Sequence, residues 1–447
     1  MTNTVNTREL ILEVLLEITR DGEYSHIAIA NVLGKYQYLD KKDRAFITRV
    51  TEGTLENLIQ IDHIINSFSK VPVNKMKPQI RCIVQSAVYQ IYFMDAVPDS
   101  AACNEAVRLA QKKGFRTLSG FVNGVLRNIS RSKKQGAQAI WPDKVKEPEK
   151  YLSVRYSIPE WMIRMWKDEF SYQWDNEEDW QGMESMLQAF LVPAPVTVRT
   201  NTDRCTPQEL KQQLEAEGVA VTVCEALPYA FEITGYDYLG ALDSFQNGLF
   251  YVQDMNSMLV AESAKPKEHD FVLDVCAAPG GKAIHMAQML HGTGRVLARD
   301  LTEYKASLLR DNIRRCQVKN MEVQVWDARV FDESLSEKAD IVVADLPCSG
   351  LGVMRRKKDI RYKMTPQKMQ GLVQLQREIL LAVYRYVKPG GRLVYSTCTV
   401  HREENEGNAQ WFLQNRPEFR QLSSHLALPG EKTGDGFYIT VFERAVS

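Results

Sequence analysis

From Gly248 onward the sequence alternates between short apolar runs and amphipathic stretches of helical length, and this alternation restricts the possible fold more than any other feature. The apolar runs are FVLDVC, RVLARD, EVQVWD, ADIVVADL and GRLVYSTC. Strands that alternate with helices predict a Rossmann-like, doubly wound α/β domain with a mostly parallel sheet, which we assign to residues 248–447. In such sheets ligands bind beyond the carboxyl ends of the strands. The residues that end each run are therefore candidates for a site.

The chain before this domain divides into segments of different character. Residues 1–135 carry apolar side chains at the 3.6-residue period, as between Leu10 and Ile18, and this period predicts an all-α domain. The stretch Ser130–Pro148 is polar, basic and contains proline, as expected of a linker, which we place at residues 136–150. Residues 151–247 combine helical stretches with the alternating runs PVTVRTN and VAVTVCEA, which predict a small α+β domain.

The composition indicates an ordinary soluble protein, with a formal net charge of +0 and 25% charged residues. No apolar run approaches the roughly 18 residues that cross a bilayer, and the polar stretch Met1–Arg8 lacks the apolar core of a signal peptide. We therefore expect a cytoplasmic protein without a membrane role. Residues 1–135 carry 19 Lys and Arg against 13 Asp and Glu, and this surplus of 6 is compatible with a polyanionic partner.

Eight cysteines are spread along the chain without CxxC spacing and without a neighbouring cluster of histidines. This distribution argues against a zinc site, so we expect no metal. A disulfide framework is also not expected, because such frameworks are typical of short secreted domains. The usual role of a single cysteine is that of a small buried apolar residue.

The first apolar run of the α/β domain continues into a glycine-containing loop, made of Cys276, Ala277, Ala278, Pro279, Gly280, Gly281 and Lys282. Its glycines allow close approach of a ligand to the backbone and supply amides at a helix N-terminus. The loop is not GxGxxG, which argues against a dinucleotide. A turn that merely joins strand to helix is the alternative.

Acidic residues end the next two runs. Asp300 stands where such folds bind ribose hydroxyls, and Asp327 stands where a carboxylate would meet an adenine amino group. A helix N-terminal charge remains the alternative for Asp300, and an ordinary strand-end residue the alternative for Asp327.

Two cysteines follow the last two runs, Cys348 in Asp345-Leu-Pro-Cys and Cys398 in Thr-Cys-Thr. Both belong to the end of the sheet where ligands bind, which favours a thiol-dependent reaction over packing alone. The thiolate is the nucleophilic form of cysteine and can form a covalent intermediate. Nothing in the spacing ranks one cysteine above the other.

The strings DVCAAPGGK, DLPCSGLG, KPGGRLVYSTCT and REENE closely resemble the RNA (cytosine-5)-methyltransferase family. The segment QDMNSML, the terminal DGFY, the chain length and the helical N-terminal extension resemble its bacterial small-subunit (16S) ribosomal RNA branch, the Fmu/Sun type. There the N-terminal domain is similar to the antiterminator NusB, and the resemblance implies an RRM-like middle domain. It spans essentially the whole chain. The pattern is broken at Arg299, Leu346 and Trp326.

This resemblance implies S-adenosylmethionine (SAM) as the cofactor. The loop 276–282 would hold its methionine and ribose part, and Asp300 and Asp327 would bind its ribose and adenine. Asp345 would line the site, Cys398 would be the nucleophile, and Cys348 would assist release of the methylated product.

The chemistry of cytosine is consistent with this assignment. Carbon 5 of cytosine is a poor nucleophile, and addition of a thiolate to carbon 6 converts the ring into an enamine-like species whose carbon 5 attacks a sulfonium methyl group. An acid near N3 stabilises the charge that develops, a role that suits Asp345 if burial raises its pKa. Methylation of nitrogen or of a hydroxyl requires no such thiol.

Basic residues suggest where RNA binds. Arg127 and Arg131 are four residues apart on one face of a helix, and Arg355, Arg356 and Lys357 open a basic run that continues to Lys363. A solvated surface run is the alternative. We expect a monomer whose partner is 16S ribosomal RNA. A transfer RNA cytosine methyltransferase and a catalytically inactive RNA-binding or antitermination factor are the alternative functions.

Overall fold

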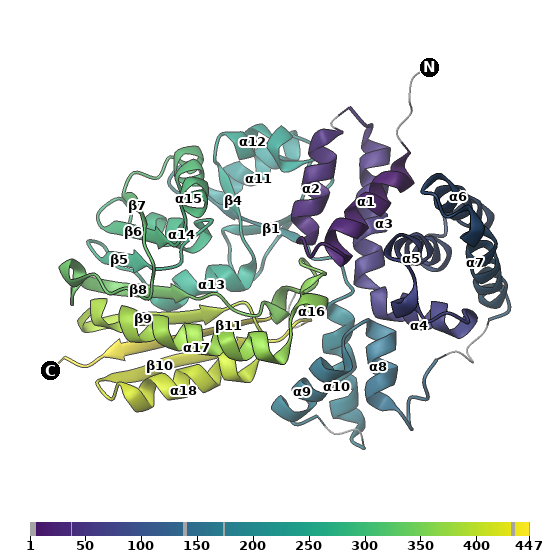
Figure 1. The fold of residues 1–447 in the computed structure, drawn as a ribbon. Coiled ribbons are helices and arrows are strands. Elements are labelled where there is room, and N and C mark those ends of the chain that lie inside the picture. The colour runs from purple at the N-terminus through teal and green to yellow at the C-terminus, as the bar shows by residue number, and fades with distance from the viewer. Residues whose placement is uncertain (1–5, 37, 137–140, 173–174, 431–433, 447) are drawn as a thin grey trace. The chain divides into compact units, whose positions relative to one another are not determined.

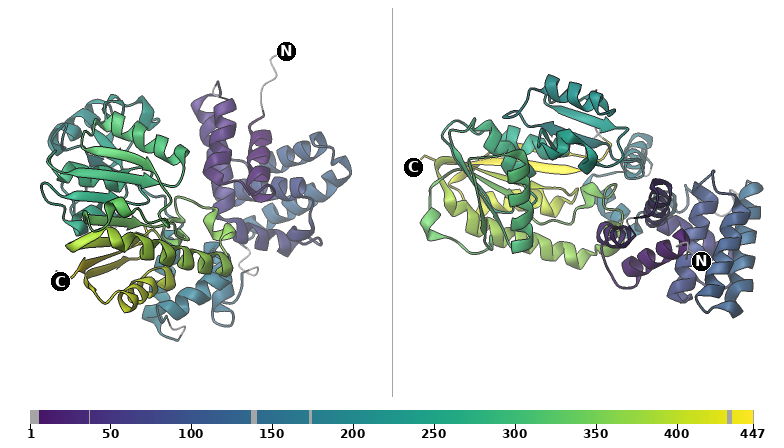
Figure 2. Two further views of the ribbon diagram at one scale, coloured as in Figure 1. Left: turned by 60° about the vertical axis from the view of Figure 1, so that its left-hand side comes forward. Right: turned by 90° about the horizontal axis from the view of Figure 1, so that it is seen from above.

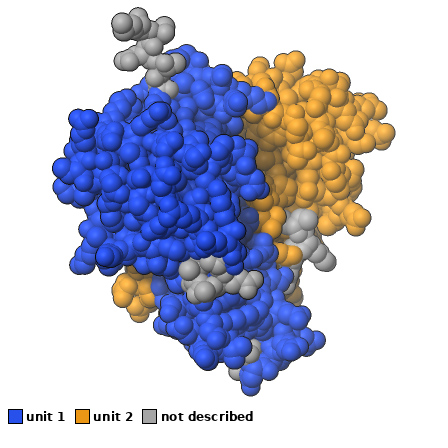
Figure 3. Space-filling model, turned by 90° about the vertical axis from the view of Figure 1, so that its right-hand side faces the viewer, with its two compact units in different colours: residues 1–191, 354–363 blue, residues 192–353, 364–447 orange. Residues whose placement is uncertain are grey.

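The computed structural model describes residues 6–36, 38–136, 141–172, 175–430 and 434–446. The chain forms two compact units, which are coloured separately in Figure 3. Unit 1 comprises residues 1–191 and 354–363, and unit 2 comprises residues 192–353 and 364–447. The predicted linker 136–150 falls partly on residues 137–140, which lie outside the described residues.

Unit 1 is helical, so the prediction of an all-α N-terminal domain is confirmed. Its helices are α1 (Thr7–Thr19), α2 (Ser25–Lys35), α3 (Lys41–Glu56), α4 (Leu58–Phe68), α5 (Pro78–Phe93), α6 (Asp99–Lys112), α7 (Ser119–Lys134), α8 (Pro148–Tyr156), α9 (Glu160–Glu169), α10 (Glu177–Ala189) and α16 (Ile360–Lys363). Helix α5 is the most buried and packs against α1, α3, α4, α6 and α7 (Figure 1). Apolar periodicity between Ile80 and Ile91 identified this helix, and every residue from Cys82 to Ile91 is buried, as expected of a helix at the centre of a domain.

Helices α8 to α10 belong to unit 1, whereas the sequence grouped them with the strands that follow. Helix α8 packs against α4, and the Ser157 hydroxyl that ends α8 accepts a hydrogen bond of 2.9 Å from the Ile59 amide. Periodicity identifies a helix but does not reveal which neighbour it packs against.

The chain returns to unit 1 at residues 354–363, just after the Pro-Cys motif. Asp359 accepts hydrogen bonds from the amide and the hydroxyl of Ser25, and Lys358 forms an ion pair of 2.7 Å with Glu56. The Arg361 guanidinium is fully buried and donates to the carbonyls of Glu56 and Ser157. Lys358 and Arg361 of the basic run thus bind protein groups rather than solvent.

Unit 2 contains two sheets. The smaller is antiparallel with the order β2-β3-β1-β4, formed by β1 (Val196–Thr200), β2 (Ala220–Val223), β3 (Ala230–Thr234) and β4 (Phe250–Val252). Helices α11 (Pro207–Ala216) and α12 (Asp243–Gln246) accompany it. Thr206 caps α11 in a capping box with Glu209, which explains why the helix starts where the Thr-Pro pair predicted. The predicted α+β character is confirmed.

The larger sheet has seven strands in the order β10-β11-β9-β8-β5-β6-β7. Its strands are β5 (Phe271–Asp274), β6 (Arg295–Asp300), β7 (Met321–Val325), β8 (Ala339–Asp345), β9 (Val387–Thr397), β10 (Phe419–Ala427) and β11 (Phe437–Arg444). The strands from β9 to β7 are parallel, as the sequence predicted, and β10 and β11 add an antiparallel edge.

Helices cover both faces of the larger sheet (Figures 1 and 2). Helices α13 (Met255–Ala264), α14 (Gly281–Met289) and α15 (Glu303–Cys316) pack on one face, and α17 (Pro366–Val383) and α18 (Glu406–Asn415) on the other. Successive residues of a strand face opposite sides of the sheet, so Val343 packs toward the layer of α13 to α15 and Val342 toward the layer of α17 and α18. No helix in the described part of the chain is long and apolar enough to span a membrane.

Gly248 tests the junction between the two sheets of unit 2. Its φ is +66°, and a Cβ atom there would lie 1.9 Å from the Arg315 carbonyl oxygen. We expect Gly248→Ala to lower the free energy of unfolding by about 2–5 kcal/mol, because strain and overlap with backbone add. Gly371→Ala in α17 is the control. There a Cβ meets no described atom within 4 Å, and we expect stabilisation of about 0.5–1 kcal/mol. Equal urea midpoints for the two variants would contradict this account.

Candidate active site

The glycine loop lies at the carboxyl end of β5 and leads into α14. Gly280 caps α14 with a φ of +116°, a conformation that strains any residue with a Cβ. The amides of Ala277 and Ala278 donate to the Arg299 carbonyl (2.9 Å) and to Asp300 Oδ2 (3.0 Å). The end of β6 therefore fixes the conformation of the loop.

Arg199 of β1 supports the same loop from the smaller sheet, and sequence reasoning missed it. Its buried guanidinium donates to Gln253 Oε1 (2.8 Å), to Gln288 and to the Gly281 carbonyl (3.5 Å). The Tyr251 hydroxyl donates to the Pro279 carbonyl at 3.0 Å. The one signal in the sequence was a charged residue in the otherwise uncharged strand VTVRT.

Asp274 ends β5 beneath the loop and is only 1% exposed. Burial, together with the nearby charge of Asp345, raises the pKa of Asp274 to about 7. Its Oδ1 accepts from the Cys276 amide at 3.3 Å, whereas its Oδ2 has no hydrogen-bond partner among the described residues. A buried carboxylate oxygen without a partner suits a cationic ligand.

Lys282 and Asp345 form an ion pair at the centre of the site. Lys282 Nζ lies 2.7 Å from Asp345 Oδ2, and the Ser396 hydroxyl donates to Asp345 Oδ1 at 2.7 Å. Burial alone would lower the pKa of Lys282, but the adjacent Asp345 carboxylate outweighs it and the pKa is raised. The sequence assigned Lys282 only to cofactor binding, and its pairing with Asp345 became visible only in the structure.

Asp300 and Asp327 differ in their surroundings. Asp300 is buried, accepts from the Ala278 and Leu301 amides and lies 3.0 Å from Lys305 Nζ. Asp327 follows β7 and forms a 2.7 Å ion pair with Arg329, whose hydrogen bonds lower the pKa of Asp327. Asp300 thus helps to hold the glycine loop in its conformation, whereas Asp327 forms an ion pair with Arg329 near the surface.

Two positions at which the sequence breaks the family pattern contact each other. The buried Arg299 guanidinium lies 4.5 Å from the centre of the Trp326 ring, and it also bonds to Gln324 and Asp332. A large aromatic residue before Asp327 therefore has a cation as its partner.

Cys348 and Cys398 lie side by side, with their sulfur atoms 3.4 Å apart. The parallel register of β8 and β9 sets Asp345 opposite Ser396, so the loops after these strands run together. The hydrogen bond to Cys398 and burial raise the pKa of Cys348 well above its ordinary value, and the charges of Cys398, Glu404 and Asp345 add to this effect. Both side chains are half-buried.

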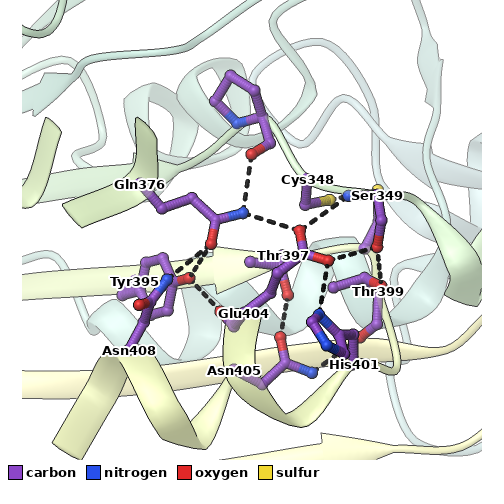
Figure 4. A network of polar contacts seen from close by, with 12 residues as sticks. Cys348, Ser349, Gln376, Tyr395, Thr397, Thr399, His401, Glu404, Asn405 and Asn408 are labelled. Carbon is purple, nitrogen blue, oxygen red and sulfur yellow. Dashed lines mark hydrogen bonds and ion pairs between the residues drawn. The ribbon is translucent and has the colours of Figure 1, made fainter. Parts of the chain in front are cut away.

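A buried polar network surrounds the two cysteine loops (Figure 4). Its centre is Glu404, at the end of the short 3₁₀ helix Arg402–Glu404, and Glu404 is fully buried. Its carboxylate accepts from the amide and the hydroxyl of Ser349, and it also bonds to Gln376 and His401. Sequence reasoning included Glu404 in the REENE string but assigned it no role.

The predicted RNA-binding residues all belong to unit 1. Arg127 and Arg131 are exposed on α7, and Arg127 donates to Asn123 at 2.9 Å. In the segment 354–363, Arg356 and Lys357 are exposed, whereas Arg355 is 7% exposed. No group of three or more potential metal ligands is found within the described ranges.

Comparisons with known proteins give consistent matches. Residues 261–443 match the family described as 16S rRNA methyltransferase RsmB/F, residues 5–131 match the NusB family, and residues 158–236 match the RsmF/B-like ferredoxin-like domain. The probable ribosomal RNA small subunit methyltransferase B of Bacillus subtilis is 34% identical over 95% of this chain and 92% of its own. That of Synechocystis is 30% identical over 99% and 100%. The crystal structure of PH0851 shares the fold, with a TM-score of 0.80, 24% identity and 99% of both chains covered.

The raised pKa of Asp274 predicts how stability depends on pH. Ordinary aspartate ionises near pH 4, so the unfolded chain loses this proton well before the folded protein, and the folded state becomes less stable between about pH 4 and 7. Asn cannot ionise. We therefore expect the stability of Asp274→Asn relative to the natural protein to rise over this range by up to about 4 kcal/mol and then to level off.

Urea unfolding at pH 5, 6, 7 and 8 measures this difference. The control is Glu268→Gln, which removes an exposed carboxylate just before β5 and so shows what the loss of a surface carboxylate does in the same pH series. A difference for Asp274→Asn that does not change with pH would show that Asp274 does not titrate in this range.

Proposed function

Because the chain belongs to the family of ribosomal RNA small subunit methyltransferase B, we propose that it methylates carbon 5 of a cytosine in small-subunit (16S) ribosomal RNA. It is a SAM-dependent RNA methyltransferase. The cytosine base, its carbon 5 and the covalent route are what we propose beyond the family assignment. The observation that carries it is the pair of sulfur atoms 3.4 Å apart beside the Lys282–Asp345 ion pair.

The residues at the carboxyl end of β5 fit SAM. The Oδ2 of Asp274, which has no hydrogen-bond partner among the described residues, offers an acceptor to a cation. Glycine at positions 280 and 281 keeps the loop compact, because a Cβ there would lie 3.2 Å from Leu309 or 3.3 Å from Tyr251. We assign the methionine and ribose part to the loop 276–282 and the ribose hydroxyls to Asp300. Asp327 is our candidate for the adenine side, where it would have to exchange or share its contact with Arg329. When bound, SAM supplies a methyl group on a positively charged sulfur atom.

Charges around the two thiols support Cys398 as the nucleophile. Cys398 raises the pKa of Lys282, and because this interaction is mutual, Lys282 favours the thiolate at Cys398. For Cys348, the hydrogen bond to Cys398 and burial are the main causes that disfavour the thiolate, and the charges of Cys398, Glu404 and Asp345 add to them. These surroundings agree with the ranking that the family resemblance implies.

The proposed reaction proceeds through one covalent adduct. The Cys398 thiolate forms a bond to carbon 6 of cytosine, and the electrons of the ring double bond make carbon 5 nucleophilic. The Lys282–Asp345 pair stabilises the charge that develops toward N3. After carbon 5 has gained the methyl group, its proton passes to a water molecule, the electron pair of that C–H bond restores the C5–C6 double bond, and the bond to Cys398 breaks to restore the thiolate. Cys348 assists this last stage.

RNA binding is assigned to the NusB-like domain, residues 1–135, with Arg127 and Arg131 on its surface, and to Arg355, Arg356 and Lys357. The charge surplus of residues 1–135 is consistent with binding of phosphates. The small α+β domain, residues 151–247, and the catalytic domain, residues 248–447, complete the proposed organisation. A base must leave its stack to reach a thiol, which unpaired RNA permits at low cost.

The proposed substrate is tested with purified protein, labelled SAM and total RNA from cells that lack the gene. We expect label in 16S ribosomal RNA, and bisulfite sequencing to show one class of cytosine protected only when the protein is present. Label in transfer RNA alone would show that the substrate is a transfer RNA and not 16S ribosomal RNA. Absence of label from every RNA would favour an inactive RNA-binding factor.

The roles of the two cysteines predict different outcomes for their variants. We expect Cys398→Ala to lower methyl transfer by at least about three orders of magnitude, because the nucleophile is lost. We expect Cys348→Ala to accumulate a protein–RNA adduct, visible as a shifted band on a denaturing gel. Cys205→Ala, which changes a half-buried cysteine of the smaller domain, is the control and should behave as the natural protein. An adduct in Cys398→Ala but not in Cys348→Ala would reverse the assignment.

A further inference from the structure

The two residues Glu404 and Asn405 are adjacent in sequence, and each holds one of the two cysteine loops (Figure 4). Glu404 Oε2 accepts from the Ser349 amide at 2.9 Å, so it fixes the residue after Cys348. Asn405 accepts from the Thr397 hydroxyl and donates to the Thr399 carbonyl at 3.0 Å, so it fixes the residues on both sides of Cys398. Two adjacent residues of one turn therefore hold both cysteine loops in place.

Further contacts complete this arrangement. Gln376 of α17 uses one amide group to bond to both Glu404 Oε2 and the Pro347 carbonyl, each at 2.9 Å. The residue before Cys348 is thus held as well. The hydroxyls of Ser349 and Thr399 are 2.7 Å apart and join the two loops directly. All of these residues except Pro347 are buried. Hydrogen bonds contribute most to stability in a buried environment, where they exchange least with water.

Glu404 also places a negative charge beside one thiol. Among the described residues, the titratable and charged groups near Cys348 include Cys398, Asp345 with its partner Lys282, Glu404 with its neighbour His401, and Tyr395. Of the two carboxylates, Asp345 has a lysine partner at 2.7 Å, whereas Glu404 has His401, which is charged only when protonated. A fully buried carboxylate disfavours a second negative charge close by.

We propose that Glu404 is a positioning residue of the reaction: together with Asn405 it holds the two cysteine loops at the separation seen between the sulfur atoms, and its negative charge adds to the surroundings that disfavour a thiolate on Cys348. The reaction that it serves rests on the proposed function. The placement of the loops and the protonation of Cys348 do not.

Substitution by glutamine separates the two roles. In Glu404→Gln the amide oxygen can accept from the Ser349 amide and Gln376, and the amide NH₂ can donate to the Ser349 hydroxyl and to His401, since both of these groups can also accept. The shape and bonds of the network are kept and the charge is removed. Glu404→Ala removes both. Glu403→Gln makes the same chemical change at the exposed neighbouring position and is the matched control.

Alkylation by iodoacetamide reports on the charge without RNA or SAM. Peptide mass spectrometry follows Cys348 over a pH series in Cys398→Ala protein, which removes the coupling between the thiols. At pH 8 we expect Glu404→Gln to increase alkylation of Cys348 about tenfold, which corresponds to one pKa unit, and Glu403→Gln to leave it unchanged. Rates for Glu404→Gln within twofold of the parent would overturn the electrostatic role.

Methyl transfer reports on positioning. We expect Glu404→Ala to lower kcat about a hundredfold with KM for SAM nearly unchanged, because displaced loops misalign the thiols, and Glu404→Gln to retain most of kcat. Calorimetric binding of SAM shows that each variant is folded. Equal kcat values for the Ala and Gln variants would overturn the positioning role. If alkylation behaves as expected but no cytosine is methylated, the proposed function fails and the electrostatic inference stands.

Discussion

The parallel pairing of β8 with β9 is the constraint on which the site depends. The register places Asp345 opposite Ser396, and the hydroxyl of Ser396 donates to Asp345 across the strands at 2.7 Å. Because the period of a strand is two residues, a slip of one residue would turn every side chain of β9 to the other face of the sheet. The pairing is fixed by the two apolar layers that β8 and β9 serve, so burial of side chains such as Val342 and Val343 also determines where the thiols lie.

The carboxylates of the site differ in their partners. Around the loop of residues 276–282, Asp345 has a lysine partner, Asp300 accepts from the Ala278 amide, and Asp274 has an oxygen without a hydrogen-bond partner among the described residues. Around the cysteines, the positive charge of Lys282 lies toward Cys398 and the carboxylate of Glu404 toward Cys348. The two thiols thus have different charged neighbours, which come from residues that sequence spacing alone would not group together.

Much of the fold could be predicted from the sequence because its elements are locally determined. The five parallel strands are short apolar runs, and α11 begins at a Thr-Pro capping signal. The antiparallel edge formed by β10 and β11 was not predicted, since β10 is exposed along most of its length and carries little apolar signal. The grouping of α8 to α10 with the N-terminal helices, and the return of residues 354–363 to that unit, depend on contacts between distant parts of the chain.

The candidate site shows the same division. Strand ends located Asp300, Asp345, Cys348 and Cys398, because the carboxyl edge of a parallel sheet gathers them. The sequence did not reveal Arg199 beneath the glycine loop, the Lys282–Asp345 pair or the Glu404 network, since each joins residues from separate elements. The proposed roles of the two cysteines depend on these supporting residues.

The central claim is that Cys398 forms a covalent bond to carbon 6 of a cytosine, and RNA that contains 5-fluorocytidine tests it most directly. Fluorine at carbon 5 cannot leave as a proton, so the adduct should persist after methyl transfer. After digestion, mass spectrometry should find the peptide of Cys398 joined to a methylated fluorocytidine nucleotide. Methylation of ordinary RNA without any adduct on fluorinated RNA, or an adduct at Cys348 instead, would contradict the account.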